Sequence, residues 1–382
     1  MTEQALYDLT PAIRLALLGI AVAAGPLAWV WLRNREAAPA QRLAALTVLT
    51  LFLTFDLVLF GAFTRLTDSG LGCPDWPGCY GNASPVGAIA QIRAEEARMP
   101  TGPVTHGKAW VEMVHRYLAT GVGVLITTLM VATFLQRKRG VPVSPWWPAL
   151  TFVWVCLQGA FGALTVTMKL FPAIVTLHLL GGLVLLALLT MQAVAYRQAQ
   201  RGKGLAPIAP SARGWLLAAA VLVWLQVALG GWVSTNYAVL ACSEFPMCQG
   251  SWWPAMDLRQ GFELWRELGK TGTGEHVTFA ALTAIHYVHR LMAYAVLAVL
   301  GIVAWQLRGG PLRRASRALA GLALWQFATG LSNVVLDWPM LAAVSHTGGA
   351  AALVVVLTWA LRASRTAPAA ATQAIGTREV SA

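Results

Sequence analysis

Four histidines occur as two pairs that are repeated along the chain. His115 and His178 lie in the first half, and His289 and His346 follow them in the second half at nearly constant offsets. A single histidine in an apolar segment is as readily a hydrogen-bonded core residue as a ligand, but a duplicated pair favours ligation. Two imidazoles at one depth on two helices can bind one haem iron from opposite faces. Zinc would require a tighter cluster of four ligands, usually with Cys or a carboxylate. The residues therefore predict one bis-histidine haem site in each half of the chain.

The two halves differ next to the first histidine of each pair. Glu112 stands three residues before His115, whereas His286 stands three residues before His289. Residues at i and i+3 share a helix face, so Glu112 is expected to point towards whatever His115 binds. A site that moves protons or activates a C–H bond needs such a carboxylate, and a pure electron carrier does not. An acid that complements the dipole at a helix start is the alternative.

Three arginines accompany the histidines. Arg116 and Arg290 directly follow ligand candidates, and Arg65 lies in the stretch TRLTDSG at the end of an apolar segment. The guanidinium fork suits carboxylates such as the two haem propionates. Anchoring of the helices at lipid headgroups is the competing role for each of them.

Two cysteine pairs share one spacing. Five residues separate Cys73 from Cys79 and also Cys242 from Cys248, and the two pairs lie at almost the same offset as the repeated histidines. Prolines and a glycine in the first pair's loop allow the chain to turn back, so we expect two disulfides on the oxidising side of a membrane. Their role, structural or redox-active, is open. Cys156 is expected to be a small core residue.

The elements that position these residues are membrane spans. The chain of 382 residues is 57% hydrophobic and only 12% charged, about half the charge of an ordinary soluble chain. Apolar runs of about 20 residues recur, the length that crosses a bilayer as helix. Asp56 lies inside the second run, where a polar contact between helices and a proton path are both open roles. We predict nine spans, at 11–33, 43–63, 109–135, 147–168, 172–196, 213–235, 276–306, 315–336 and 340–361.

The basic residues predict the orientation of these spans. The net charge is +12, but 17 of the 28 basic residues fall in loops on one side, opposed there only by Glu36 and Glu379. This distribution is typical of cytoplasmic loops rather than of a nucleic-acid partner. We therefore expect a multi-pass inner (plasma) membrane protein in a lipid bilayer, with the N-terminus and both cysteine loops outside and the C-terminus in the cytoplasm.

An internal repeat organises the chain. Besides the cysteines and histidines, Gln158 and Gly162 have counterparts at Gln326 and Gly330, both at the same offset that separates His178 from His346. The predicted fold class is an all-α polytopic membrane protein with two tandem pseudo-symmetric four-helix bundles and one extra N-terminal helix.

The predicted units follow from this repeat. Residues 1–42 hold the extra helix and a linker, 43–200 the first unit, 201–362 the second unit and 363–382 a disordered tail. The first helix has acidic residues before its only nearby arginine, so we expect it to be retained rather than cleaved as a signal peptide.

From residue 43 to 361 the chain resembles haem A synthase of bacteria and mitochondria. The resemblance rests on GAFTRLTDSGLGCPDWPGCYG, EMVHR and HYVHRL together with the two later histidines. It implies two successive oxidations of the C8 methyl of haem O, to an alcohol and then to a gem-diol that loses water to give the formyl group of haem A. It also implies a haem b that relays electrons, and a product that supplies haem-copper oxidases.

The resemblance also assigns residues to these roles. His115 and His178 would hold the substrate haem, and His289 and His346 the haem b. Glu112 would be the essential glutamate, and both cysteine pairs would match loop disulfides of the family. The extra first helix departs from the family pattern and has no assigned role.

Two other functions compete with this enzyme. One is a dihaem b-type electron-transfer protein linked to quinol, and the other is a haem carrier for an oxidase. The inequality of Glu112 and His286 favours the enzyme. Haem O synthase and the assembly of the terminal oxidase are the expected partners, while the electron donor, the oxygen source and homo-oligomer formation are left open.

Overall fold

The structure is a computed structural model that describes residues 10–141, 143–201 and 205–366. Within these ranges nine helices are long and apolar enough to cross a membrane, as predicted, and the chain is a multi-pass membrane protein. They are α1 (Thr10–Arg33), α2 (Pro39–Leu66), α4 (His106–Lys138), α5 (Trp146–Thr167), α6 (Pro172–Arg201), α7 (Pro210–Thr235), α9 (Phe279–Leu307), α10 (Arg313–Val335) and α11 (Met340–Ala363). The predicted disordered tail, 363–382, is wrong at its start, because Ala363 ends α11 and Ser364–Thr366 form a paired strand; from 367 onward it lies outside the described residues.

Local sequence explains where several of these helices begin. Pro39 and Pro210 stand at the first turns of α2 and α7, where a missing N–H costs nothing. Thr105 and Thr278 cap α4 and α9, and each side-chain oxygen accepts a backbone N–H at 3.3 Å. The two halves therefore start equivalent helices by the same devices, and α4 and α9 are the helices that carry His115 and His289.

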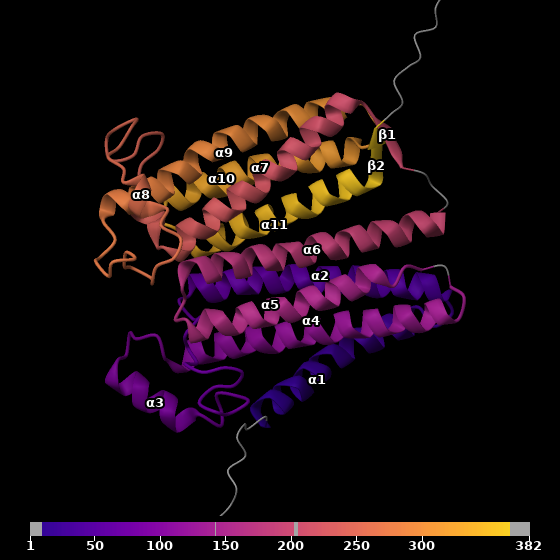
Figure 1. Cartoon of the computed structure of the whole chain (residues 1–382), viewed down its shortest axis with the longest axis horizontal. Coiled ribbons are helices and arrows are strands. Elements are labelled where there is room, and N and C mark those ends of the chain that lie inside the picture. Colours follow the sequence, from indigo (N-terminus) through magenta and orange to yellow (C-terminus); the bar gives the residue numbers. More distant parts are fainter. Residues whose placement is uncertain (1–9, 142, 202–204, 367–382) are drawn as a thin grey trace, which may run out of the picture.

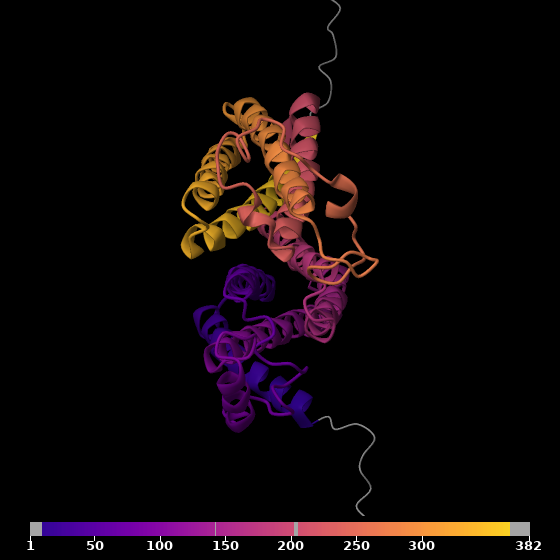
Figure 2. The same cartoon turned by 90° about the vertical axis from the view of Figure 1, so that its left-hand side faces the viewer.

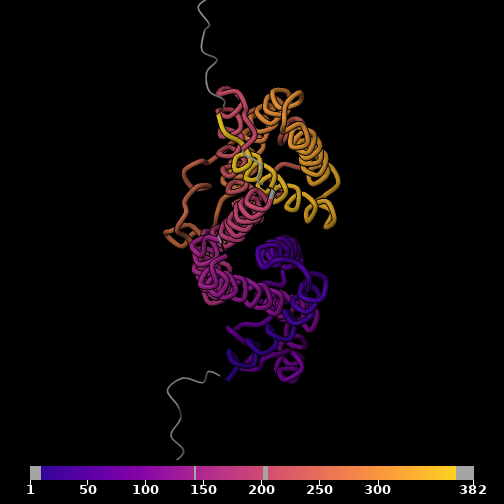
Figure 3. Tube along the Cα trace, turned by 90° about the vertical axis from the view of Figure 1, so that its right-hand side faces the viewer, coloured from indigo at the N-terminus to yellow at the C-terminus, as the bar shows by residue number. Residues whose placement is uncertain are grey.

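The helices form two four-helix bundles side by side (Figure 1). In the first, α2, α4, α5 and α6 pack in a ring; in the second, α7, α9, α10 and α11 do so. The bundles meet where α6 and α2 contact α11 and where α6 contacts α7. Figures 2 and 3, which look along the bundles from opposite ends, show the indigo-to-magenta half on one side and the orange-to-yellow half on the other. The predicted all-α fold class is confirmed.

Helix α1 packs outside the first bundle against α4. The contact is close, because a Cβ on Gly19 would clash with Cγ2 of Thr120 and one on Gly121 would lie 2.9 Å from Cγ1 of Val22. Small residues let the backbones of membrane helices approach in this way. The extra helix is therefore a packed part of the first half.

Two long loops leave the same end of the molecule, at the left of Figure 1. The first contains α3 (Ile89–Arg98) and the second contains the 3-10 turn Ala238–Ala241 and α8 (Leu258–Gly261). Each holds its predicted disulfide, Cys73–Cys79 and Cys242–Cys248, with Cα atoms 4.9 Å apart in both. The expectation of two disulfides is confirmed.

The opposite end of the molecule holds a feature that the sequence pattern did not predict. Strand β1 (Ala206–Ile208), in the linker between the bundles, pairs in parallel with β2 (Ser364–Thr366), directly after α11. Arg213 donates to the carbonyl oxygen of Ser364 at 3.0 Å. These contacts fasten the start of the second bundle to its end.

Candidate functional site

All four paired histidines line one cavity of about 760 Å³. Its walls come from all eight helices of the two bundles and are mostly apolar, with Leu15 of α1 at its edge. A largely apolar cavity with a few polar groups is typical of a cofactor or ligand site. Glu112, Arg116, His286 and Arg290 also lie on this wall.

In the first bundle each histidine faces a glycine of the neighbouring helix. A Cβ built on Gly61 of α2 would lie 3.1 Å from Cε1 of His115, and one on Gly162 of α5 would lie 3.3 Å from Cε1 of His178. Both distances are tighter than ordinary van der Waals contact. A larger residue at either glycine would therefore displace the imidazole.

The second bundle repeats this arrangement. A Cβ built on Gly230 of α7 would lie 3.0 Å from Cε1 of His289, and one built on Gly330 of α10 would lie 3.2 Å from Cε1 of His346. The predicted pairing of Gly162 with Gly330 thus has a physical reason, because both make room for a histidine. Gly61 and Gly230, which hold equivalent places in the repeat, form a second such pair that sequence reasoning missed.

The Nδ1 atoms of three of the paired histidines have polar neighbours. The amide nitrogen of Gln158 lies 3.1 Å from Nδ1 of His178, and that of Gln226 lies 3.1 Å from Nδ1 of His289. Oγ1 of Thr329 lies 2.9 Å from Nδ1 of His346. Metal-bound histidines almost always have a partner at the ring nitrogen that does not bind the metal.

His115 is the exception among the four. Its Nδ1 is buried and has no hydrogen-bond partner among the residues that the structure describes. The ring instead lies parallel to that of Phe60, with centroids 6.3 Å apart. Its imidazole is thus held by shape alone.

The donor set fits a haem better than a bare metal ion. Each bundle presents two histidines from two helices to an apolar cavity, and such a pair could hold a haem iron. No group of three or more His, Cys, Asp or Glu that could hold a metal ion occurs in the described ranges 10–141, 143–201 and 205–366. A zinc site of the usual kind would need such a group.

Glu112 joins the first bundle to its disulfide loop. One carboxylate oxygen accepts the backbone N–H of Cys73 at 2.7 Å, and the other pairs with the guanidinium of Arg116. Both side chains are buried, at 5% and 8% exposure. Glu112 is on the cavity wall with His115, as expected, but its oxygens are bound to the loop and to Arg116.

Arg116 is also occupied by the loop. Its Nη1 lies within hydrogen-bond distance of three carbonyl oxygens, those of Asp75 at 2.9 Å, Pro77 at 3.2 Å and Gly78 at 2.5 Å. The sequence suggested haem propionates or lipid headgroups as its partners. The structure instead places this guanidinium between Glu112 and the loop backbone.

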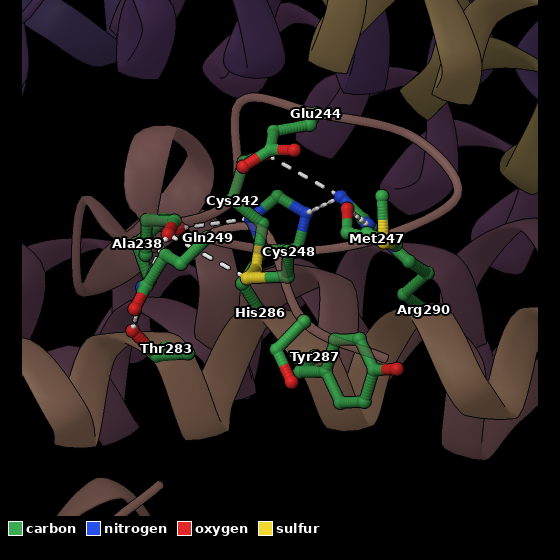
Figure 4. Close-up of a disulfide and its surroundings, with 12 residues drawn as sticks. Ala238, Cys242, Glu244, Met247, Cys248, Gln249, Thr283, His286, Tyr287 and Arg290 are labelled. Atoms are coloured by element: carbon green, nitrogen blue, oxygen red, sulfur yellow. Dashed lines mark hydrogen bonds between the residues drawn. A yellow bond between two sulfur atoms is a disulfide. The ribbon is translucent and has the colours of Figure 1, made fainter. Parts of the chain in front are cut away.

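The second bundle has the same arrangement with an imidazole in place of the carboxylate (Figure 4). Arg290 donates to the carbonyl oxygens of Met247 at 2.9 Å and Cys242 at 3.4 Å. Nδ1 of His286 lies 3.0 Å from the carbonyl oxygen of Ala238. Both arginines that follow ligand candidates therefore bind loop carbonyls, and the inequality of Glu112 and His286 is the main chemical difference between the two walls.

Arg65 links the two bundles. Its guanidinium donates to the carbonyl oxygen of Ser234 at 2.6 Å, pairs with Asp68 at 3.2 Å and lies 4.1 Å from the ring centre of Tyr237. The Tyr237 hydroxyl donates to Asp68 at 2.7 Å, and burial raises the pKa of this tyrosine. Residues 65 and 234 hold equivalent places in the repeat, as do 68 and 237, so repeat-equivalent positions meet here.

Two further sequence predictions concern polar residues in the spans. Cys156 was expected in the core, but it is exposed on α5, so this prediction is wrong. The reason is that neighbouring helices cover little of α5. Only 11% of its most apolar stretch is buried, so a residue in the middle of this helix need not be enclosed. Asp56 is exposed on α2, and its side chain makes no hydrogen bond or ion pair with another described residue.

Comparison with known proteins identifies the family. Residues 44–358 match the family described as cytochrome oxidase assembly protein. The heme A synthase of Shewanella oneidensis is 37% identical over 332 residues, which cover 83% of this chain and 95% of that protein. The chain belongs to the haem A synthase family. The heme A synthases of Rhizorhabdus wittichii and Caulobacter sp. strain K31 are 28% and 29% identical and are 96% and 93% covered, over 85% and 81% of this chain.

The predicted resemblance to haem A synthases is thereby confirmed. The family match begins at residue 44, after α1, and ends at residue 358 in α11. It includes nearly all of both bundles, both disulfide loops and the four paired histidines of the cavity.

Proposed function

We propose that this member of the haem A synthase family converts haem O to haem A by oxidising the C8 methyl to a formyl group. The first unit, residues 43–200, is the reaction chamber, and the second, residues 201–362, carries a haem b that supplies electrons. Support comes from the two histidine pairs on one cavity and from the heme A synthases that the chain resembles.

One observation carries this division of labour. Glu112 is a buried carboxylate on the cavity wall one helical turn from His115, and the equivalent residue of the other unit is His286. A carboxylate can accept and return a proton where a substrate is oxidised, while electron relay needs no such group. The unit with Glu112 is therefore assigned to the chemistry.

The histidines hold the two haems in this proposal. His115 and His178 bind the substrate haem, and His289 and His346 bind haem b, because each pair faces the cavity from one bundle. When bound, the haem irons supply the electron transfer that methyl oxidation needs. The apolar cavity wall excludes water from the reacting carbon.

Glu112 and Arg116 hold the loop of the Cys73–Cys79 disulfide against the first bundle. The carboxylate binds the backbone of Cys73, and the guanidinium binds three carbonyls of the same disulfide loop. The loop therefore fixes the orientation of Glu112 as well as covering the cavity. A proton arriving at Glu112 would alter its pairing with Arg116 and with the loop together.

The proposed setting is the inner (plasma) membrane. The basic loops lie in the cytoplasm by the positive-inside rule, and the disulfide loops lie outside, where disulfides persist. Haem O synthase would supply the substrate and an assembling terminal oxidase would take the product. The electron donor and the number of chains in the assembly are not assigned.

Expression beside a haem O source tests the function. Haems extracted from the membranes are separated by chromatography and identified by mass. We expect haem A and its hydroxylated intermediate. Haem O and haem b alone, with neither product, would instead support the dihaem electron carrier.

A further inference from the structure

The unpaired nitrogen of His115 distinguishes the first unit from the second. Nδ1 of the other three paired histidines lies within 3.1 Å of a side-chain amide or hydroxyl. Nδ1 of His115 is buried without a partner among the described residues. The two units therefore secure their equivalent ligands, His115 and His289, by different means.

A single substitution between the repeats accounts for the difference. Gln226 precedes Gly230 by four residues on α7, so its amide reaches the ring of His289. The residue four before Gly61 on α2 is Leu57, which also lines the cavity. The leucine side chain has no atom that can form a hydrogen bond with Nδ1 of His115.

The surroundings of Leu57 offer no substitute. Leu57 packs with Val122 and Leu185 in an apolar cluster between α2, α4 and α6. Phe60, from the next turn, lies parallel to the ring of His115 with an interplanar angle of 7°. Leu57 and Phe60 are both apolar, so neither side chain can form a hydrogen bond with the imidazole.

A partner on the second ring nitrogen strengthens a metal–histidine bond. It fixes the ring orientation and raises the basicity of the ligating nitrogen, and its loss typically lowers metal affinity roughly 10- to 100-fold. The amide nitrogen of Gln226 lies 3.1 Å from both Nδ1 and the carbonyl oxygen of His289, so this side chain holds the orientation of the ring. A resident cofactor benefits from such a partner, whereas a substrate that must leave as product does not.

We propose that Leu57 and Gln226 are positioning residues that make the first haem site exchangeable and the second permanent. The proposal rests on the proposed function, in which the first unit binds substrate and the second a resident haem b. Leu57 leaves the bond of His115 to iron without support, and Gln226 supports that of His289. The residue at this position of the repeat, leucine in the first unit and glutamine in the second, thus distinguishes the site of the exchangeable substrate from the site of the resident cofactor.

The test measures haem release from each unit alone in the full-length protein. His289→Ala with His346→Ala removes the ligands of the second unit, and His115→Ala with His178→Ala removes those of the first. Each purified protein is loaded with haem b, and transfer to excess apomyoglobin is followed by absorbance. We expect the first unit to release haem about 10-fold faster than the second, or more.

Two reciprocal substitutions test the residues themselves. Leu57→Gln in the first-unit protein should slow release about 10-fold. Gln226→Met, which keeps volume but removes the amide, should speed release from the second unit roughly 10- to 100-fold. Leu57→Met is the matched control and should release haem like its parent. Slower release after Leu57→Gln is a gain that packing damage would not produce.

The outcomes separate this inference from the function. Equal release from both units, or unchanged release after Leu57→Gln and Gln226→Met, would overturn the inference even if the intact chain makes haem A. Release rates as expected in a chain that makes no haem A would leave the inference standing and reject the function. If a double alanine variant does not fold, the intact variants are challenged with apomyoglobin and the haems retained are identified by mass.

Discussion

Replacing Glu112 by glutamine probes the ion pair that connects the chamber to its loop. Glutamine has nearly the same shape, and its carbonyl oxygen can still accept the N–H of Cys73. Its amino group would face the guanidinium of Arg116, donor against donor, and the negative charge would be lost. The substitution therefore removes the charge of Glu112 and leaves the packing of the helix unchanged.

The expected cost follows from burial. Both side chains are less than a tenth exposed, and removing one partner of a buried ion pair costs about 3–5 kcal/mol because an uncompensated charge remains. Three loop carbonyls still surround Arg116, so we expect the lower value, about 3 kcal/mol, as a fall in the free energy of unfolding. Removing both charges, with Glu112→Gln and Arg116→Met, should recover no stability, because it also leaves three loop carbonyls without their donor.

Thermal unfolding in detergent and haem analysis together separate the two roles of Glu112. We expect Glu112→Gln to unfold at lower temperature and to make no haem A. Unfolding of Glu112→Gln at the wild-type temperature would refute the energetic reasoning. Normal haem A from folded Glu112→Gln would refute the catalytic assignment.

Three further substitutions test other parts of the site. Gly61→Val should displace the imidazole 3.1 Å away and lower the haem content of the first unit, measured by pyridine haemochrome absorbance. Arg65→Met should remove the hydrogen bond and ring contact that join the bundles and cost about 2 kcal/mol, measured by thermal unfolding against Tyr237→Phe as the milder control. Cys242→Ser with Cys248→Ser should cost about 2 kcal/mol through loss of the loop constraint, and an unchanged unfolding temperature would contradict this.

Much of the fold could be predicted because membrane spans depend on length and apolarity. All nine runs are helices, although α2 is longer at both ends than predicted and α9 begins at Phe279, after its threonine cap. Strands β1 and β2 are three residues each, too short for any alternation of apolar and polar residues to reveal them. The existence of a membrane helix can thus be predicted from the sequence, whereas short strand pairings between distant segments cannot.

Comparison of the two halves predicted which residues lie at the site better than it predicted what their side chains contact. It identified the histidines and the inequality of Glu112 and His286, but not that Arg116 and Arg290 bind loop carbonyls, because backbone acceptors leave no trace in side-chain patterns. Gln226 could have been found, since comparison of the repeats places Leu57 at the same position.

The contacts of Tyr237 with Arg65 and Asp68 could not be predicted from the sequence. Asp68 and Tyr237 are repeat equivalents that touch, as expected of positions near a pseudo-two-fold axis between the units. The repeat alone gives no reason to place this axis there, because it fixes which positions correspond and leaves their distance from the axis undetermined.

The most direct test of the unequal units asks which haem each one holds. His289→Ala with His346→Ala leaves only the first pair of histidines, and His115→Ala with His178→Ala leaves only the second. Each protein is expressed beside a haem O source, and its bound haem is identified by mass. We expect haem O in the first case and haem b in the second. The reverse distribution, or haem b alone in both, would contradict this expectation.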